Sequence, residues 1–229
     1  MNTGDVRSSD RVIEYVETMI MAGKLKAEDR LPTERDLAQM LNVSRTAVRE
    51  GIHLLEISGI VECRQGSGNY ITKHFDQTLE RVLTMMYALD ELNQSQIREF
   101  RYAVERQALT LAVGNAEDKD RTLLAQHLDG LLNGASEEVQ IESDRLLHLQ
   151  LVRMSGNRLV IANYMALNRI IGRSIRDVRK RIHDQSPELF EQFREVHRML
   201  VQAVLSGDLE QAKSALDQHF RFISENYDT

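Results

Sequence analysis

The chain of 229 residues has one cysteine, two prolines and only 5% aromatic residues, and it contains no long apolar run. The single cysteine, Cys63, excludes an internal disulfide and is typical of proteins from reducing compartments. The scarcity of proline and aromatic residues favours helix over sheet. With 42% hydrophobic and 28% charged residues, the composition is that of an ordinary folded protein rather than a disordered or fibrous one.

The N-terminal stretch MNTGDVRSSDRVIEYVETMIMAGK carries charges on both sides of short apolar pieces. It matches neither a secretory signal nor a membrane span, because a span needs about 20 apolar residues. We therefore expect a cytoplasmic protein that makes no contact with a membrane.

The formal net charge of -6 argues against a protein that coats nucleic acid through bulk positive charge. A small, locally cationic surface remains compatible with this charge, so each segment has to be considered separately. The length suits two domains of modest size.

Three short amphipathic segments come first in the sequence. Residues 11–20 place apolar side chains at three- and four-residue steps. A second helix is predicted after Thr33, which forms an S/T-x-x-D cap with Asp36, and a third after Ser44. Two short strands, IVEC and NYIT, follow around the glycine-rich turn RQGSG. Three helices and a hairpin predict a winged helix-turn-helix over residues 1–74.

All segments after residue 74 have helical patterns, which predicts a second, all-α domain over residues 75–229. The predicted fold class is therefore mostly α. An N-terminal winged helix-turn-helix with a small β-hairpin wing precedes a C-terminal helical bundle.

The stretch NVSRTAVRE places Arg45 and Arg49 one helical turn apart at the start of the third predicted helix. In a helix-turn-helix this helix lies in the major groove, where an arginine can donate twice to guanine O6 and N7. Both arginines are therefore candidate base readers. Ser44 and Thr46 occupy the first turn, where backbone N–H groups favour a phosphate oxygen.

Two further places in this region are candidate DNA contacts. Arg35, at the start of the preceding helix, is a candidate phosphate contact. Gln65 and Gly66, beside Arg64 at the hairpin tip, form a wing that can reach the minor groove or the sugar-phosphate backbone. The alternative is that the two arginines of the third helix lie on a solvated face, as most surface arginines do.

The stretch LPTERDLAQMLNVSRTAVREGIHLLEISGIVECRQGSGNYI resembles the DNA-binding domain of the GntR family of bacterial transcription regulators, and the match extends over residues 10–72. The resemblance implies DNA contacts by Arg35, Arg45, Thr46 and Arg49, with Gly66 at the wing tip. Gln65 stands at a position that varies in the family.

A second group of residues has the chemistry of metal ligands. Asp144 and His148 are four residues apart, on one face of a predicted helix. His197 and His219 lie in two helices that the short turn SGD folds antiparallel, so both can reach the same interior point. Three nitrogens and one oxygen suit zinc, with nickel or manganese as alternatives. The other interpretation is that each histidine is an ordinary core or surface residue.

The second domain resembles the helical effector domain, named FCD, of the FadR-type branch of the same family, over about residues 80–225. This resemblance implies that the domain binds an effector, forms the dimer and holds a divalent metal through Asp144, His148, His197 and His219.

Arg101 lies on the same helical stripe as apolar residues, where a charge needs a partner. One interpretation is an internal ion pair with Glu105, one turn further along. The other is that Arg101 binds the carboxylate of an effector in a cavity beside the metal. Asn168 and Arg173 are weaker candidates for the same pocket.

These observations predict a bacterial regulator, without enzymatic activity, that binds a palindromic double-stranded operator as a homodimer. The resemblance favours a repressor whose effector is a small organic acid or sugar acid. Two alternatives remain: a metal sensor, in which the ion itself is the signal, and a metal-dependent hydrolase.

Overall fold

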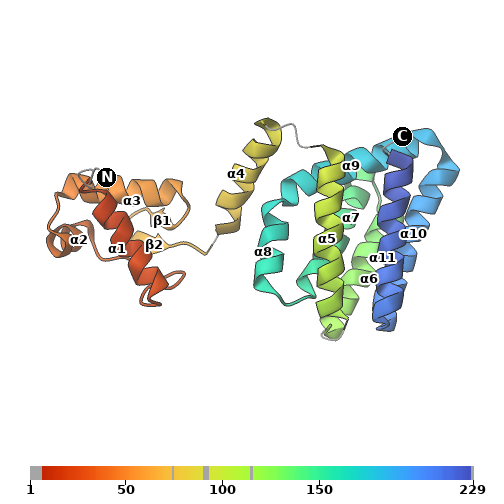
Figure 1. Ribbon diagram of the computed structural model, residues 1–229, viewed down its shortest axis with the longest axis horizontal. Coiled ribbons are helices and arrows are strands. Elements are labelled where there is room, and N and C mark those ends of the chain that lie inside the picture. Colours follow the sequence, from red (N-terminus) through yellow and green to blue (C-terminus); the bar gives the residue numbers. More distant parts are fainter. Residues whose placement is uncertain (1–6, 74, 90–92, 114–115, 228–229) are drawn as a thin grey trace, which may run out of the picture. The chain divides into compact units, whose positions relative to one another are not determined.

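The computed structural model describes residues 7–73, 75–89, 93–113 and 116–227 and divides the chain into two compact units, Met1–Leu79 and Glu80–Thr229. Figure 1 shows the small N-terminal unit with its hairpin and the larger helical unit. The predicted fold class is confirmed. Residue 74, where the sequence predicted the domain boundary, lies outside the described residues, and the two units divide within helix α4.

The N-terminal unit consists of three helices and one antiparallel hairpin. Their bounds are α1 Asp10–Met21, α2 Glu34–Leu41, α3 Arg45–Ile57, β1 Val61–Arg64 and β2 Gly68–Ile71. Buried apolar side chains from all three helices and both strands form one core, which includes Val12, Val16, Leu37, Val48, Ile52, Leu55, Val61 and Ile71.

The connection between α2 and α3 is tight for local reasons. Thr33 caps α2 by accepting a hydrogen bond from the backbone N–H of Asp36, and Ser44 caps α3 through the N–H of Ala47. Asn42 ends α2 with a φ of 50°, a left-handed conformation that asparagine tolerates better than most residues. Both predicted caps are confirmed.

The hairpin is displaced slightly from its predicted position. Its first strand extends to Arg64, and its second begins at Gly68, so the turn is shorter than RQGSG. Arg30, in the loop before α2, forms a bridge to Tyr70, and backbone hydrogen bonds join the same loop to β2. Because this loop supports the hairpin from one side, the wing is tied to the helical part of the unit.

The C-terminal unit is entirely helical within the residues described. After α4 (Phe75–Leu89), the helices are α5 Gln94–Ala112, α6 Asp118–Asn133, α7 Glu137–Arg153, α8 Arg158–Ala166, α9 Asn168–Gln185, α10 Pro187–Ser206 and α11 Leu209–Tyr227. Helix α10 ends at Gly207, whose φ of 79° favours glycine, and α11 returns antiparallel beside α10.

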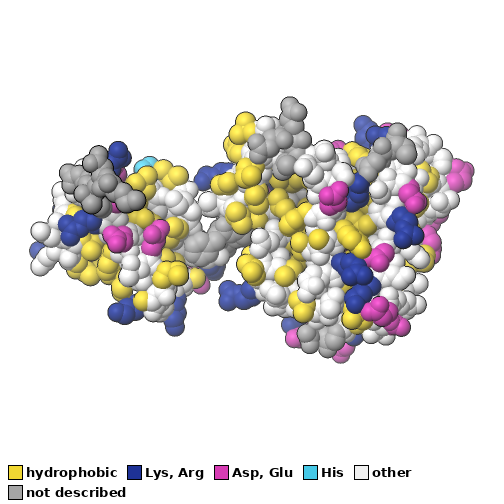
Figure 2. Space-filling view, viewed as in Figure 1, with side chains coloured by type: hydrophobic (Ala, Val, Ile, Leu, Met, Phe, Trp, Pro, Cys, Tyr) yellow, Lys and Arg dark blue, Asp and Glu magenta, His cyan; other side chains and the backbone are white. Residues whose placement is uncertain are grey.

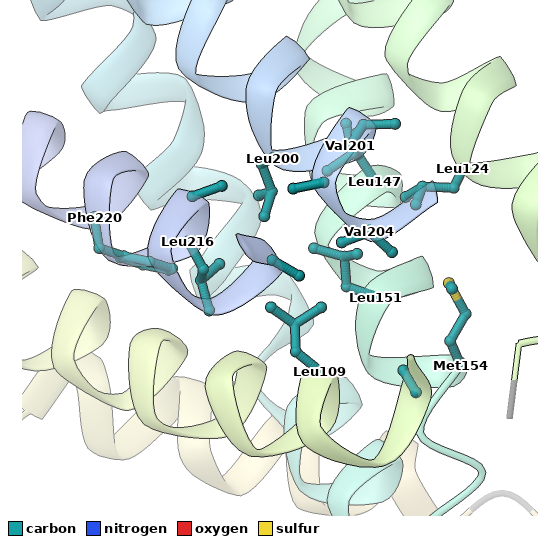
Figure 3. Packing of buried hydrophobic residues seen from close by; sticks show 14 of the residues in the cluster. Leu109, Leu124, Leu147, Leu151, Met154, Leu200, Val201, Val204, Leu216 and Phe220 are labelled. Carbon is teal, nitrogen blue, oxygen red and sulfur yellow. The ribbon is translucent and has the colours of Figure 1, made fainter. Parts of the chain in front are cut away.

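The largest apolar core of this unit lies between α5, α6, α7, α10 and α11. Figure 3 shows Leu109 of α5, Leu147 and Leu151 of α7, Leu200 of α10 and Leu216 of α11 pointing toward one another. These helices also carry the candidate site, so its side chains are fixed by a closely packed scaffold.

Helix α4 differs from the other helices because much of its apolar surface is exposed. Figure 2 shows hydrophobic side chains gathered over it, and its exposed apolar residues are Leu79, Val82, Met85, Met86 and Leu89. Among the residues described, no helix combines the length and apolarity that are needed to cross a bilayer.

Candidate functional site

The start of α3 presents the predicted DNA-contacting side chains to solvent. Ser44, Arg45, Thr46 and Arg49 are all exposed, while Val48 on the opposite face is fully buried. Because Ser44 Oγ accepts a hydrogen bond from Ala47 at 3.1 Å, the cap fixes the direction in which this helix end points. The geometry is that of a recognition helix, and the DNA contacts themselves stay a prediction.

Arg49 has a partner that was not expected from the sequence. Its Nε atom donates to Glu34 Oε2 at 2.7 Å, although the Arg49 side chain remains 67% exposed. Glu34 is the first residue of α2. This ion pair joins Arg49 of α3 to the start of α2. A hydrogen bond from Arg49 Nε to a base would require the ion pair to open.

The other predicted contacts lie at two separate places on the N-terminal unit. Arg35 is exposed at the start of α2, and Gln65 and Gly66 are exposed at the hairpin tip. Gly66 has a φ of 73°, a conformation that a side chain would strain. The guanidinium of Arg64 lies over the Tyr70 ring at 4.4 Å, which stiffens the wing.

The four predicted metal ligands meet at one buried point. Asp144 and His148 come from α7, His197 from α10 and His219 from α11, and none is more than 1% exposed. The Nε2 atoms of His148 and His197 each lie 3.5 Å from Asp144 Oδ1. The three histidines offer ligand atoms that all lie within 4.8 Å of one another.

These separations match the size of a metal site. Zinc–nitrogen and zinc–oxygen bonds of about 2.1 Å place tetrahedral ligand atoms roughly 3.4 Å apart. Each of the three rings also has an unpartnered nitrogen: among the described residues, His148 Nε2, His197 Nε2 and both His219 nitrogens have no hydrogen-bond partner. Buried polar atoms without partners are costly, and a bound cation would provide a partner for one nitrogen of each ring.

Two of the histidine rings are oriented by hydrogen bonds that their Nδ1 atoms make with the protein. His148 Nδ1 lies 2.6 Å from Glu105 Oε2, and His197 Nδ1 lies 2.8 Å from the carbonyl oxygen of Phe193. A proton on each Nδ1 donates to these acceptors, which leaves the Nε2 lone pair directed at the centre. Burial lowers the pKa of His148, although Glu105 opposes this, and burial together with the neighbouring histidines lowers that of His219 well below its ordinary value.

Asp144 is held ionised by its surroundings. Arg179 Nη1 donates to Asp144 Oδ2 at 3.2 Å, which leaves Oδ1 for the histidines. Burial alone would raise the pKa of the Asp144 carboxyl, but His197, Arg179 and His148 together hold it well below its usual range. The carboxylate is therefore available as an anionic ligand.

Arg101 forms the internal ion pair with Glu105 that one interpretation predicted. Arg101 Nε donates to Glu105 Oε1 at 3.2 Å, and the Tyr164 hydroxyl donates to the same oxygen at 2.7 Å. Burial alone would lower the pKa of Arg101 and raise that of Glu105, but their attraction, with His148 beside the acid, reverses both shifts. Arg101 Nη2 has no partner among the residues described, so one donor of this buried arginine remains available.

A small cavity separates Arg101 from the ligand cluster. Its volume is about 10 Å³, and its polar lining consists of Arg101, Asp144, His148 and His219. This volume is roughly what one water molecule requires. In this conformation the cavity has room for an ion but not for an organic acid.

Asn168 and Arg173, the weaker candidates for the effector pocket, do not line this cavity. The Asn168 side-chain oxygen accepts a hydrogen bond from Arg145, and Arg173 is exposed. The physical reason is the phase of α9, whose buried face includes Ile171, Ile175, Val178 and Arg179, so that Arg173 points to the opposite side.

Comparison with known proteins identifies both parts of the chain. The FCD domain model matches residues 96–222, which is more than half of the chain, and the model of the gntR family of bacterial regulatory proteins matches residues 8–71. The chain belongs to the GntR family of transcription regulators. Within the family, the FCD domain places it in the FadR-type branch.

Similar regulators align with nearly the whole chain. The HTH-type transcriptional regulator LutR of Bacillus subtilis is 28% identical over 90% of this chain and 95% of its own length. The HTH-type transcriptional repressor NanR of Klebsiella aerogenes is 27% identical over 96% of this chain and 85% of its own. A solved structure of a Streptococcus agalactiae GntR protein, 22% identical, covers 95% of this chain and 99% of its own with a TM-score of 0.69, which supports the same fold.

Sequence reasoning for this GntR-family chain missed Arg179 and the contact between Glu105 and His148. Arg179 could have been found by the argument applied to Arg101, because it lies four residues after Ile175 on an apolar stripe. The contact of Glu105 with His148 joins α5 to α7, and the spacing of residues within either helix does not predict a contact between the two helices.

Proposed function

We propose that this GntR-family chain is a cytoplasmic DNA-binding repressor whose FCD domain holds a divalent ion beside a carboxylate effector. The observation that carries this proposal is the convergence of Asp144, His148, His197 and His219, with Nε2 atoms that lack protein partners. Three nitrogens and one carboxylate oxygen favour zinc, with nickel or manganese as alternatives.

The effector part of the proposal depends on Arg101. Arg101 lines the same cavity as Asp144 and two of the histidines, its Nη2 has no partner among the described residues, and a carboxylate is the natural partner of a buried guanidinium. A bound ion supplies further positive charge on the other side of the cavity. A small organic acid or sugar acid is therefore the effector class that this chemistry supports.

The DNA-binding part rests on the exposed start of α3 and on the wing. We propose base contacts by Arg45 and Arg49 and backbone contacts by Arg35, Ser44, Thr46, Gln65 and Gly66. We further propose a homodimer on a palindromic operator, because two-fold symmetry in the protein is matched by two-fold symmetry in the site. The exposed apolar side chains of α4 are one surface that a second copy could cover.

Repression is the direction we propose because NanR, one of the similar proteins, is named a repressor. The proposed absence of enzymatic activity is supported by the regulators LutR and NanR, which align with nearly the whole chain. An assay of metal-dependent ester and phosphate hydrolysis tests it, and turnover that is lost in His197→Ala would favour the hydrolase alternative.

One observation favours the metal-sensor alternative. The cavity of about 10 Å³ accepts an ion as it stands, whereas an organic acid requires the surrounding helices to move apart. The two possibilities differ in which ligand changes the affinity for DNA.

A DNA-binding titration tests the proposed function. Binding sites are selected from random duplex DNA, and the affinity of the best site is measured with metal-free protein, with zinc, and with zinc plus acetate, lactate, citrate or gluconate. We expect a two-fold symmetric site whose affinity falls at least about fivefold with one of the acids, and this loss should be absent in Arg101→Lys. A response to zinc alone would favour the metal sensor, and failure to select any DNA sequence would contradict the proposal.

A further inference from the structure

A second cavity lies on the other side of Arg179. It has a volume of about 370 Å³, and its walls come from the turn between α6 and α7, the first residues of α7, and the ends of α9 and α10 that meet at His183 and Phe190. None of the four predicted metal ligands lines it. We call it the outer cavity.

Arg179 forms the inner wall of the outer cavity and has one donor to spare. Its side chain is only 2% exposed. Nη1 donates to Asp144 Oδ2 and Nη2 to Gln140 Oε1, at 3.2 and 3.1 Å, but Nε has no partner among the residues described. The centroids of the Phe190 and Phe193 rings lie 5.4 and 5.8 Å from the guanidinium carbon. A buried N–H without an acceptor carries a desolvation cost, and a ligand oxygen that accepts its hydrogen bond removes this cost.

The start of α7 adds further donors to the same cavity. Ser136 caps this 17-residue helix by accepting from the N–H of Val139, and the N–H groups of Glu137 and Glu138 in the first turn have no partner within the helix. The positive end of the helix dipole is therefore directed at a space that Arg179 also lines. Both features attract an anionic oxygen.

The charge balance of the buried groups indicates when such an anion is held most tightly. In the C-terminal unit, the described buried side chains with full charge are Arg101 and Arg179 against Glu105 and Asp144, so the charges cancel. A divalent ion at Asp144 would add two positive charges to this set. Because charge is expensive to bury without a counter-charge, an anion beside Arg179 would become more favourable.

We infer that the outer cavity is a second ligand site, which takes a small monocarboxylate and is coupled to the metal centre through Arg179. Glu137 lines the same cavity, and its negative charge disfavours a doubly charged phosphate relative to a carboxylate. A monocarboxylate bound in the outer cavity would contact Arg179, which also donates to Asp144 Oδ2. Binding of the monocarboxylate and binding of the metal ion therefore each stabilise the position of Arg179 that the other requires. The coupling rests on the proposed metal function, whereas the outer site itself does not.

The outer site is tested without metal. Acetate is titrated into the EDTA-treated full chain, labelled with ¹⁵N, and the backbone amide signals of Ser136, Glu137 and Glu138 are followed. We expect these signals to shift and saturate, independently of any change near Arg101. Inorganic phosphate should bind more weakly than acetate, and tighter binding of phosphate would overturn the assignment to carboxylates.

Two matched variants locate the binding. Ser136→Asp keeps an N-cap residue but places a negative charge in the outer cavity, so acetate affinity should fall at least about fivefold. Asn157→Asp makes the equivalent change at the N-cap of α8, beyond the other end of α7, and should leave the affinity unchanged. Unshifted amides in the wild-type chain, or equal acetate affinity in the two variants, would overturn the outer site.

The coupling is tested by the zinc affinity of the same two variants, measured with a competing chelator with and without acetate. Acetate should tighten zinc binding at least about fivefold more in Asn157→Asp than in Ser136→Asp. An equal effect of acetate in both variants would refute the coupling. A chain that binds no zinc would refute the proposed metal function, while the metal-free titration would still decide the outer site.

Discussion

At the scale of single residues, Glu105 connects the proposed metal ligand His148 with Arg101, which lines the proposed effector cavity. One of its oxygens faces His148, and the other accepts hydrogen bonds from Arg101 and Tyr164. A carboxylate behind a metal-binding imidazole fixes the tautomer of the ring and raises its basicity. Glu105 therefore supports both the proposed ion and the proposed carboxylate.

Replacing Glu105 by glutamine should weaken zinc binding about 10- to 100-fold, because His148 loses its anionic acceptor. Competition with a chelator of known affinity measures the change. Glu99→Gln, at an exposed position on the same helix, is the control and should bind zinc as the wild type does. Equal zinc affinity in the two variants would mean that Glu105 serves only the packing of the core.

The buried histidines predict how the stability of the metal-free protein depends on pH. The pKa of His219 is lowered in the folded chain, so the unfolded chain takes up a proton near pH 6.5 that the folded chain does not. The free energy of unfolding should therefore be steady above about pH 7 and fall as the pH drops, by at most about 1.4 kcal/mol per pH unit for each such histidine. The lowered pKa values of Glu105 and Asp144 add a further loss below about pH 4.

Urea unfolding of the metal-free protein at pH 8, 7, 6 and 5 measures this dependence. His219→Asn should flatten the decline between pH 7 and 5, whereas the same change at the exposed His183 should leave it in place. A stability that stays constant or rises toward pH 5 in the wild type would contradict the burial of a neutral His219.

At the scale of secondary structure, the position of α7 determines the geometry of the ligand cluster. Helix α6 packs closely against it at Gly130, where an added Cβ would lie 2.3 Å from Ser143 Oγ. Ser143 directly precedes Asp144 in α7. The absence of a side chain at Gly130 therefore lets α6 approach and fix the turn of α7 that carries Asp144, one of the proposed metal ligands.

Helix α3 offers a test that separates folding from DNA binding. Ser44→Ala removes the acceptor for the Ala47 N–H and should cost about 1 kcal/mol of unfolding free energy. Ser44→Asp keeps the cap, and with it the stability, but it brings a negative charge to the helix end that we propose faces the DNA phosphates. Affinity for all DNA sequences should then fall alike.

Thermal unfolding and fluorescence anisotropy on labelled duplexes measure the two effects. If Ser44→Asp bound DNA as tightly as the wild type, the start of α3 would not face the phosphate backbone.

At the scale of the whole molecule, local patterns in the sequence predicted the elements but not their long-range partners. The caps at Thr33 and Ser44 and the spacing of Asp144 and His148 depend on neighbours along the chain, and the structure confirms the caps and brings the predicted ligands together. The contact of Arg49 with Glu34 depends on tertiary packing. Arg173, two residues from the buried Ile171 and Ile175, is exposed because a shift of two residues along a helix moves a side chain to the opposite face.

The measurement that tests this account most directly is the zinc content of the chain after dialysis against zinc and removal of the excess. The account predicts about one zinc ion per wild-type chain, and clear loss of zinc when His148 or His219 is replaced by alanine. His127→Ala, which changes a histidine outside the cluster, should retain the ion. A wild-type chain that takes up no zinc, nickel or manganese, or an ion that survives the loss of both His148 and His219, would contradict the proposed metal centre.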